Sequence, residues 1–418
     1  MKIAIIGGGI SGNAITYLLH QHHDVTLYEA NDYIGGHSRT IDVKTPDGLI
    51  PVDTGFIVFN ERNYPHLCGL FKHLDVPTQK STMSFGVSVN NGWLEYGTPR
   101  PQNIFAQKEN ILRLSFLRLI KDILKFNNKA ERHLDAKEDI TLEELLTQMK
   151  MSEWFKQYYL LAMGASIWST PVNVMLEFPA KTFIQFFKNH GLLTIFDQPQ
   201  WHTVQDGSRE YVSRITEPFK DKIKLNCPIK SVKRDSDKVQ VEDAHGNIEH
   251  YDQVIFACHS DQALNILSNP TPDEQSILGA IRYQPNKMIL HTDTSFMPKR
   301  KNAWTSWVYL SEQQQDNSNS VSLSYWMNNL QPLETQTPII VTLNPGRSPD
   351  PKQIKDEYTF EHPVFDQAAI NAQQELHKIQ GKDKIWYCGA WQRYGFHEDG
   401  ILSAVNVAKE FGITPPWT

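Results

Sequence analysis

Three glycines near the start of the chain have the spacing of a phosphate-binding turn. Gly7, Gly9 and Gly12 follow a short apolar run, Lys2 to Ile6, of the kind that forms a buried strand of a parallel sheet. In such a turn the first glycine permits the tight bend, the second lets a pyrophosphate approach, and the third lets the next helix pack on the strand. The amides at the start of that helix favour phosphates.

An acidic residue completes this pattern. A helical stripe of Ile15, Leu18 and Leu19 precedes a second strand-like run, DVTLYEA, which contains Glu29, 17 residues after Gly12. A carboxylate near this offset accepts hydrogen bonds from both ribose hydroxyls and favours a ribose without a 2′-phosphate. Strand, glycines, helix, strand and acid in this order predict a dinucleotide-binding unit.

A second group of reactive side chains lies near the C-terminus, in the segment GAWQRYGFHEDG at 389–400. His397 either moves protons near neutral pH or only holds the loop in place. Glu398 and Asp399 either make polar contacts at a site or cap the following helix, whose dipole favours acids in its first turn. Tyr394 and its aromatic neighbours form either a wall of a site or ordinary core. We select His397, Tyr394 and Glu398 as candidate catalytic residues.

Composition excludes several other classes of protein. A length of 418 residues favours two domains, and a net charge of −6 with a pI near 6.2 argues against a nucleic-acid partner. The four cysteines have no CxxC or Cys/His spacing, so we expect neither a metal site nor a disulfide framework. The apolar run at the start is too short for a signal peptide, and no later run is long enough to span a membrane. We therefore expect a soluble, cytoplasmic protein.

The middle of the chain changes from helical to strand-like character. The run NILRLSFLRLIKDILKF predicts a basic amphipathic helix over 111–125, which either contacts a membrane surface or anionic ligand, or packs its apolar face on a core. Apolar and polar residues alternate from 223 to 260 and predict a β-meander. YDQVIFACH, near its end, is expected to be a strand that returns to the parallel sheet. KMILHTD, AWTSWVYL and SVSLSYWMNNL predict further strands, and SEQQQDNSNS a polar hairpin loop.

Several of these segments resemble the FAD-dependent amine oxidase and phytoene desaturase superfamily. EANDYIGGHSRT is similar to the segment after the ribose acid, where a Gly-Gly-Arg element closes over the pyrophosphate. Gly35 and Gly36 match that element, but His37 stands in place of the arginine and Arg39 follows three residues after Gly36. Either Arg39 or only the backbone therefore meets the phosphates, or the two glycines form only a turn and Arg39 is a surface charge. VDTGFIVFN resembles the superfamily segment that runs beneath the flavin.

The resemblance continues towards the C-terminus. WHTVQDGSREYVSRI resembles the stretch that re-enters the FAD domain, and the resemblance implies that Val232, at the end of IKSV, offers backbone hydrogen bonds to adenine. In the superfamily, the closing segment consists of a Gly-Glu pair, a variable loop and the start of a helix. The segment at 389–400 resembles it, but Ala390 stands in place of the glutamate. The resemblance therefore implies that Glu398 or Asp399 supplies the polar contact. VDTGFIVFN, LHTD…FMP and GFHEDG together resemble a bacterial branch called NAD/FAD-binding or amine-oxidase-like. Its genes tend to neighbour cyclopropane-fatty-acid-synthase-like methyltransferases, which implies lipid chemistry.

The glycine pattern and the resemblance together predict a set of cofactor-binding residues. FAD is expected to be noncovalent, because the loop at 389–400 holds no cysteine and Cys388 lies on the strand before it. A covalent link through a histidine is the alternative. The predicted contacts are Gly7, Gly9, Ile10, Ser11, Gly12, Glu29, Ala30, Gly35, Gly36, His37, Arg39, Thr54, Gly55, Phe56, Val232, Gly389, Ala390, Glu398, Asp399, Gly400 and Ile401.

The implied fold class is α/β, with two interleaved domains. The first is a Rossmann-type, glutathione-reductase-like FAD-binding domain formed by 1–80, 195–262 and 346–418. The second is an α+β substrate domain formed by 81–194 and 263–345.

Three functions are compatible with these observations. The first is an FAD oxidoreductase that moves a hydride from a C–H bond to flavin N5, on a lipophilic small molecule such as an unsaturated or methylated fatty-acyl chain. The second is an amine oxidase with an aromatic cage of Tyr394 and one of Trp304, Trp307 or Trp326. The third is a non-catalytic FAD-binding scaffold. A long apolar tunnel favours lipid, a short aromatic box favours an amine, and a blocked flavin face favours a scaffold.

Overall fold

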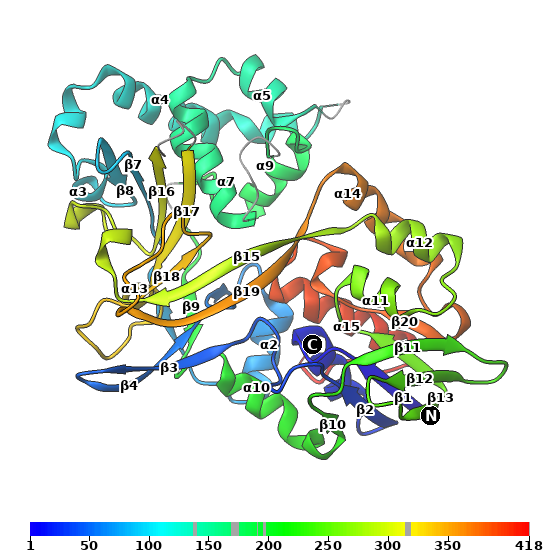
Figure 1. Ribbon diagram of the computed structural model, residues 1–418. Helices are drawn as coiled ribbons and strands as arrows, with labels where there is room; N and C mark the ends of the chain where they lie inside the picture. The colour runs from blue at the N-terminus through cyan, green and yellow to red at the C-terminus, as the bar shows by residue number, and fades with distance from the viewer. Residues whose placement is uncertain (137–139, 169–174, 190, 195–197, 314–318, 418) are drawn as a thin grey trace.

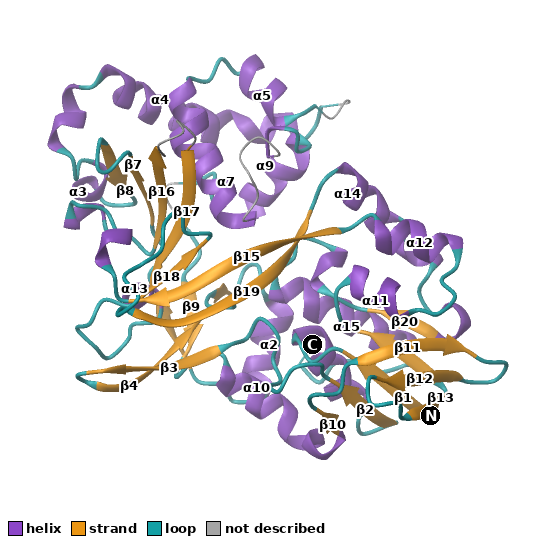
Figure 2. Ribbon diagram, viewed as in Figure 1, coloured by secondary structure: helices purple, strands orange, loops and turns teal. Residues whose placement is uncertain are grey.

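The computed structural model describes residues 1–136, 140–168, 175–189, 191–194, 198–313 and 319–417. Two units are visible in Figure 1: one around the parallel sheet that holds both termini, and one around a larger sheet with a cluster of helices at its far end. The long strands β15 and β19 run between the two units (Figure 2).

The parallel sheet has the strand order β10-β2-β1-β14-β20. Its strands are β1 (Lys2–Ile6), β2 (Asp24–Tyr28), β10 (Ile223–Lys224), β14 (Gln253–Phe256) and β20 (Ile385–Tyr387). The glycine turn after β1 leads into α1 (Ile10–Leu19), and the closing loop after β20 leads into α15 (His397–Glu410). This doubly covered parallel sheet confirms the predicted fold class.

Burial on both faces explains why β1 is apolar throughout. Ile3 and Ile5 pack in one core cluster with α1 and α15, whereas Ala4 and Ile6 pack in another, with the meander. The predicted meander is the antiparallel sheet β11 (Ile229–Arg234), β12 (Val239–Asp243) and β13 (Ile248–Tyr251). As predicted, β14 then joins the parallel sheet, where it pairs with β1.

The second unit contains a seven-stranded sheet of order β19-β15-β18-β17-β16-β7-β8. Its strands are β7 (Phe85–Val89), β8 (Leu94–Gly97), β15 (Arg282–His291), β16 (Trp307–Gln313), β17 (Asn319–Trp326), β18 (Ile340–Leu343) and β19 (Ile354–Val364). Because β19 pairs with β15, this sheet extends well beyond residue 345, the expected domain boundary. β16 and β17 pair as a hairpin, and the centre of its predicted polar loop, 314–318, lies outside the described residues.

Helices cover the far end of this sheet in Figure 1: α3 (Pro101–Ile104), α4 (Leu114–Lys129), α5 (Leu142–Gln148), α6 (Glu153–Phe155), α7 (Leu161–Trp168) and α9 (Ala180–Asn189). The helix expected over 111–125 begins at Leu114 and buries Phe116, Leu119 and Phe126. None of the described helices is long and apolar enough to cross a membrane.

Other α-helices are α2 (Pro65–His73), α10 (Arg209–Thr216), α11 (Ser260–Ile266), α12 (Pro272–Gly279), α13 (Met327–Leu330) and α14 (Gln367–Gln374). Other strands are β3 (Thr40–Thr45), β4 (Gly48–Asp53), β5 (Phe59–Asn60), β6 (Thr78–Ser81) and β9 (Trp201–Val204). Asp53 forms hydrogen bonds with residues in or next to several of these elements. Its buried carboxylate accepts hydrogen bonds from Ser208, Thr40 and Gln331, from 2.6 to 3.0 Å. The segment VDTGF therefore has a fixed position between the two units.

Candidate active site

A cavity of about 1240 Å³ runs from the carboxyl ends of the parallel strands to helix α4. Gly7, Gly9 and Glu29 line one end of it, and Ile120 and Leu124 line the other. In open α/β sheets, ligands bind in the crevice outside the carboxyl ends of the strands. The volume exceeds the roughly 300–1,000 Å³ of a typical small-molecule pocket, so the cavity has room for more than one small ligand.

The glycine turn has the three steric properties that its spacing predicts. A Cβ on Gly7, whose φ is +111°, would lie 2.8 Å from the Ala257 carbonyl, and one on Gly12 would lie 1.8 Å from the Gly7 oxygen. A Cβ on Gly9 would meet nothing within 4 Å in the part of the chain that is described. Because Gly9 lines the cavity at the start of α1, a phosphate can approach its backbone and the helix amides.

The acidic residue of the pattern lies beside this turn. Glu29 is buried, and its carboxylate accepts 2.8 Å hydrogen bonds from the amides of Gly8 and Asn31. Glu29 and Ala30 both line the cavity. The carboxylate is therefore held in position where a ribose next to the phosphates would meet it.

The Gly35-Gly36 segment packs directly on the phosphate-binding turn. A Cβ on Gly36, whose φ is +59°, would lie 3.0 Å from the Gly9 α-carbon, and Gly36 and His37 line the cavity. Gly35 packs instead against Val212. Arg39 points elsewhere: its guanidinium donates to Asp356 at 2.6 Å and lies over the Tyr358 ring. Of the alternatives for this segment, the geometry favours contact through the backbone.

The structure places Val232 away from the cavity, in the core of the meander. Its carbonyl accepts a hydrogen bond from Ser268, and its side chain is 1% exposed. Ile229, at the start of the same strand, lines the cavity together with Cys227 and Pro228. Val232 lies away from the cavity because only the first residue of β11 reaches the cavity wall, and the strand then runs into the core.

Both acids of the closing loop are engaged with backbone amides. Glu398 accepts 3.0 Å hydrogen bonds from the amides of His66 and Leu67 at the start of α2, and burial raises its pKa to about 7. Asp399 accepts hydrogen bonds from the amides of Phe396 and Tyr394, and burial raises its pKa to about 6. Glu398 thus joins two helices and Asp399 caps α15, so neither faces the cavity.

The start of α15 packs on α1. A Cβ on Gly400 would lie 2.8 Å from the Ile10 side chain and 2.9 Å from the Ser11 hydroxyl, and Ile401 is fully buried. Ile10, Ser11, Gly389 and Ala390 line the cavity, as do Thr54, Gly55 and Phe56 of the VDTGF segment. Gly400 and Ile401 support these walls from behind.

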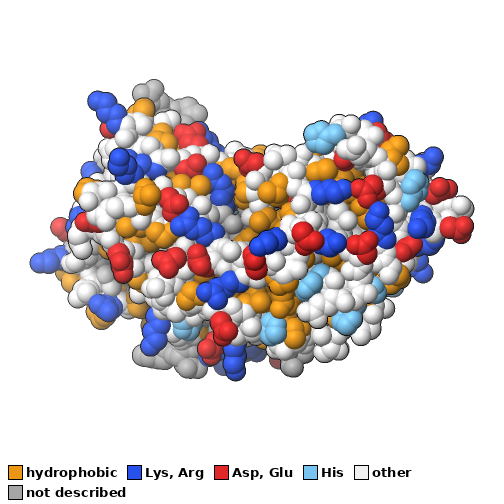
Figure 3. All heavy atoms as spheres, turned by 90° about the horizontal axis from the view of Figure 1, so that it is seen from below, with side chains coloured by type: hydrophobic (Ala, Val, Ile, Leu, Met, Phe, Trp, Pro, Cys, Tyr) orange, Lys and Arg blue, Asp and Glu red, His pale blue; other side chains and the backbone are white. Residues whose placement is uncertain are grey.

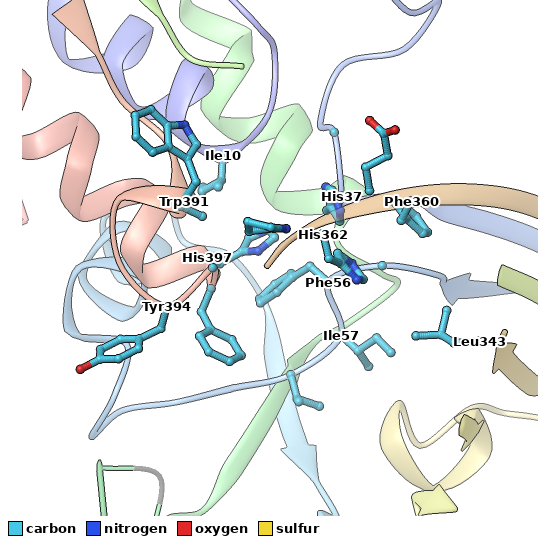
Figure 4. A pocket seen from close by; sticks show the side chains of 18 of the residues that line it. Ile10, His37, Phe56, Ile57, Leu343, Phe360, His362, Trp391, Tyr394 and His397 are labelled. Atoms are coloured by element: carbon cyan, nitrogen blue, oxygen red, sulfur yellow. The ribbon is translucent and has the colours of Figure 1, made fainter. Parts of the chain in front are cut away.

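His397 and Tyr394 both line the cavity. The His397 ring stacks on Phe56 at 3.8 Å between centroids (Figure 4). Its Nε2 lies 2.9 Å from the Ser38 hydroxyl. Burial lowers the pKa of His397 to about 3, so its imidazole is neutral at ordinary pH. Tyr394 lies 6.1 Å from Phe186 between ring centroids. This geometry favours a loop-holding role for His397 over a proton shuttle near neutrality.

Four histidines line the cavity, and we call them the histidine cluster: His37, His259, His362 and His397. Sequence reasoning selected His37 and His397 but missed His259 and His362. Figure 4 shows three of them turned towards the same part of the cavity. The His37 and His362 rings are 5.4 Å apart, and burial lowers the pKa of His362 to about 4 and the pKa values of His37 and His259 below their usual range. The signal for His362 was present, because Asp356, Tyr358, Phe360 and His362 alternate along β19.

The residues present fit FAD. The open space at Gly9 suits phosphates, Glu29 suits a ribose, and His37 Nε2 and His259 Nδ1 are buried without a hydrogen-bond partner among the described residues. No group of three or more His, Cys, Asp or Glu among the described residues could hold a metal ion. Burial raises the pKa of the Cys258 thiol, on the cavity wall, to about 12, which disfavours a covalent thioether link. Fold and site together define a dinucleotide-binding protein of the FAD type.

Comparison with known proteins identifies the family. Residues 14–359 match the family described as flavin containing amine oxidoreductase, so the chain belongs to that family. The amine oxidase [flavin-containing] A of Sus scrofa is 24% identical over 273 residues, which cover 62% of this chain and 49% of that protein. The chain thus spans about half the length of the curated relatives it matches.

Solved structures show the same fold over nearly the whole chain. Cyclohexylamine oxidase from Brevibacterium oxydans IH-35A superposes with a TM-score of 0.67 at 17% identity, covering 98% of this chain and 99% of that one. A CLA-producing fatty acid isomerase from P. acnes superposes with a TM-score of 0.66 at 14% identity, covering 98% of both chains. At these identities the likeness concerns the fold alone.

Proposed function

We propose that the chain is an FAD-dependent oxidoreductase that removes a hydride from a C–H bond of a lipophilic small molecule, such as an unsaturated or methylated fatty-acyl chain. The observation that carries this proposal is the apolar half of the cavity, which extends away from the dinucleotide end to helix α4. Its wall is formed by Phe116, Leu119, Ile120, Ile123, Leu124, Tyr159, Met163, Phe186 and Leu192. An extended apolar wall of this kind suits an acyl chain better than a small charged amine.

The histidine cluster at the junction of the two halves is neutral. Bound FAD would accept a hydride at its N5 atom, and the chain would supply position and exclusion of water. The Gly9 turn and Glu29 would hold the dinucleotide, and Phe56 stacked on His397 would fix the wall between cofactor and substrate. Because burial lowers the pKa values in the histidine cluster, these side chains present hydrogen-bonding atoms without adding charge beside an apolar substrate.

Oxidation of a small amine is the second candidate. Trp307 and Tyr325 line the cavity with ring centroids 5.0 Å apart at 88°, and Tyr394 lines it too. Trp304 and Trp326 instead pack on each other, 5.4 Å apart. Trp307 and Tyr394 are therefore the candidate walls of an aromatic cage. The third candidate, a non-catalytic scaffold, is disfavoured because a cavity extends from the dinucleotide end.

Anaerobic flavin reduction separates these candidates. The oxidised protein is mixed with unsaturated and methylated acyl lipids, or with a panel of small amines, and loss of visible flavin absorbance is followed. The proposal predicts bleaching by acyl lipids and none by amines. Bleaching by amines alone would support the second candidate, and bleaching by neither would support the scaffold.

A matched pair of variants locates the substrate. Ile123→Asp places a charge on the apolar wall and should slow bleaching by lipid while leaving FAD content unchanged. Ile248→Asp, on an exposed side chain of the meander, is the control and should behave as the wild type.

A further inference from the structure

Apolar side chains protrude from the outer side of helix α4 and the turn before it. Of the ten exposed large apolar side chains among the described residues, five lie between 111 and 124. Leu112 and Leu114 are 87% and 83% exposed, and Ile111 and Leu117 are also exposed. Single exposed leucines are normal on protein surfaces, but a cluster of this kind marks an interaction site.

Packing of α4 on its own core does not explain these residues. The face of the helix turned to the core carries Phe116, Leu119 and Phe126, which are fully buried. Leu114 and Leu117 lie on the opposite face, at helical spacing with Arg118 and Lys121, which are both exposed. The helix is therefore apolar on two sides, and its outer side has no partner among the described residues.

Basic and aromatic side chains accompany the exposed leucines. Between residues 100 and 132 the chain has eight Lys and Arg but three Asp and Glu, although its net charge is −6. Trp93, which is 43% exposed, lies beside this helix: the Arg113 guanidinium is 5.5 Å from its ring and donates to its carbonyl. By contrast, the face shown in Figure 3 has acidic and basic side chains interspersed.

We propose that this surface, formed by Trp93, Ile111, Leu112, Leu114 and Leu117 with Arg113, Arg118 and Lys121, docks on an anionic lipid bilayer; we call it the α4 surface. Protruding leucines enter the boundary between headgroups and acyl chains, tryptophan prefers that boundary, and lysine and arginine attract anionic headgroups. The excess of positive charge favours an anionic bilayer over a second copy of this chain, because two such surfaces would repel each other.

The cavity reaches the same helix. Ile120, Ile123 and Leu124 line the cavity, and Leu124 is also 44% exposed, so it lies where the cavity wall meets the outside. Docking of the α4 surface would place this end of the cavity close to the bilayer. The idea that a lipophilic substrate enters from the membrane rests on the proposed function. Docking of the α4 surface does not rest on it, because vesicle binding can be measured without turnover.

Vesicle co-sedimentation of the full-length holoprotein tests the proposal. Wild type should sediment with vesicles of phosphatidylglycerol and phosphatidylcholine, less with phosphatidylcholine alone, and less at high salt. The double substitution Leu112→Ser and Leu114→Ser should weaken binding at least about tenfold. Arg118→Glu with Lys121→Glu should weaken it at least about twentyfold, from about fivefold for each basic residue lost.

Matched controls replace two leucines by serine, or two basic residues by glutamate, elsewhere on the surface. Leu49→Ser with Leu225→Ser changes two other exposed leucines, and Lys233→Glu with Lys355→Glu changes two other exposed lysines. Both controls should bind vesicles as the wild type does, and all variants should retain flavin absorbance, which shows that they fold. The proposal is overturned if the wild type does not sediment, if the leucine variant binds unchanged, or if the wild type is a dimer that this variant converts to a monomer.

Discussion

Gly9 offers a way to remove cofactor binding without disturbing the fold. Its backbone is extended, with φ −76° and ψ −169°, so any residue can adopt its conformation. A Cβ there would meet nothing within 4 Å among the described residues, so Gly9→Val should change the unfolding free energy of the apoprotein by no more than about 0.5 kcal/mol. The valine side chain would instead occupy the space into which a pyrophosphate must move.

The size of the effect follows from the contacts that valine would prevent. A hydrogen bond from a backbone amide to a charged acceptor contributes about 1.5–3 kcal/mol. Losing two such bonds at the start of α1 should raise the Kd for FAD at least about 100-fold. Gly12→Ala makes the contrast: its Cβ would lie 1.8 Å from the Gly7 oxygen, so it should lower apoprotein stability by about 2 kcal/mol or more.

Two measurements on each variant are sufficient: the thermal midpoint of the apoprotein and the Kd for FAD from quenching of flavin fluorescence. Gly9→Val should keep the wild-type midpoint and lose FAD, and Gly12→Ala should lower the midpoint. If Gly9→Val binds FAD as the wild type does, the phosphate site has been assigned to the wrong place. If its apoprotein unfolds at a much lower temperature, the space at Gly9 is not open as the structure describes.

Three further predictions concern side chains around the site. Arg39→Gln should leave the Kd for FAD within about twofold but lower stability by about 2 kcal/mol, because Arg39 pairs with Asp356; chemical denaturation and FAD titration check this. Burial raises the folded pKa of Glu398 to about 7, against about 4.3 when unfolded, so its contribution to stability is present at low pH and is lost as pH rises through 7. Glu398→Gln should therefore gain up to about 3 kcal/mol relative to wild type between pH 5 and 8 in denaturation curves, and equal pH dependence of the two proteins would contradict the assignment. Because burial lowers the pKa of His397 to about 3, the rate of flavin reduction by wild type and by His397→Gln should follow parallel pH profiles from about pH 5.5 to 8; loss of an ionisation near neutrality in the variant would make His397 a proton carrier after all.

Local sequence was sufficient to predict those parts of the site that are formed by residues close together in the chain. The turn at Gly7, Gly9 and Gly12 and the carboxylate of Glu29 belong to one strand-helix-strand unit, so their spacing alone predicts their positions. The family and the fold followed from the same segment together with the closing loop.

The roles of the remaining site residues depend on partners that are distant in the sequence. Glu398 meets amides 331 and 332 residues away, and Arg39 meets a carboxylate 317 residues away, which local spacing does not reveal. The histidine cluster likewise combines four segments of the chain. The periodicity of the apolar residues predicted helix α4. It did not show which apolar residues pack on the core and which are exposed, because this depends on how the helix lies in the folded structure.

Anaerobic reduction of the flavin by a defined substrate tests the central claim most directly. The purified protein, with its bound cofactor identified as FAD by mass, is mixed without oxygen with an acyl lipid or with a small amine, and visible absorbance is recorded. We predict rapid bleaching by the acyl lipid and a spectrum unchanged by the amine. Bleaching by the amine while the acyl lipid leaves the spectrum unchanged would contradict the proposed function.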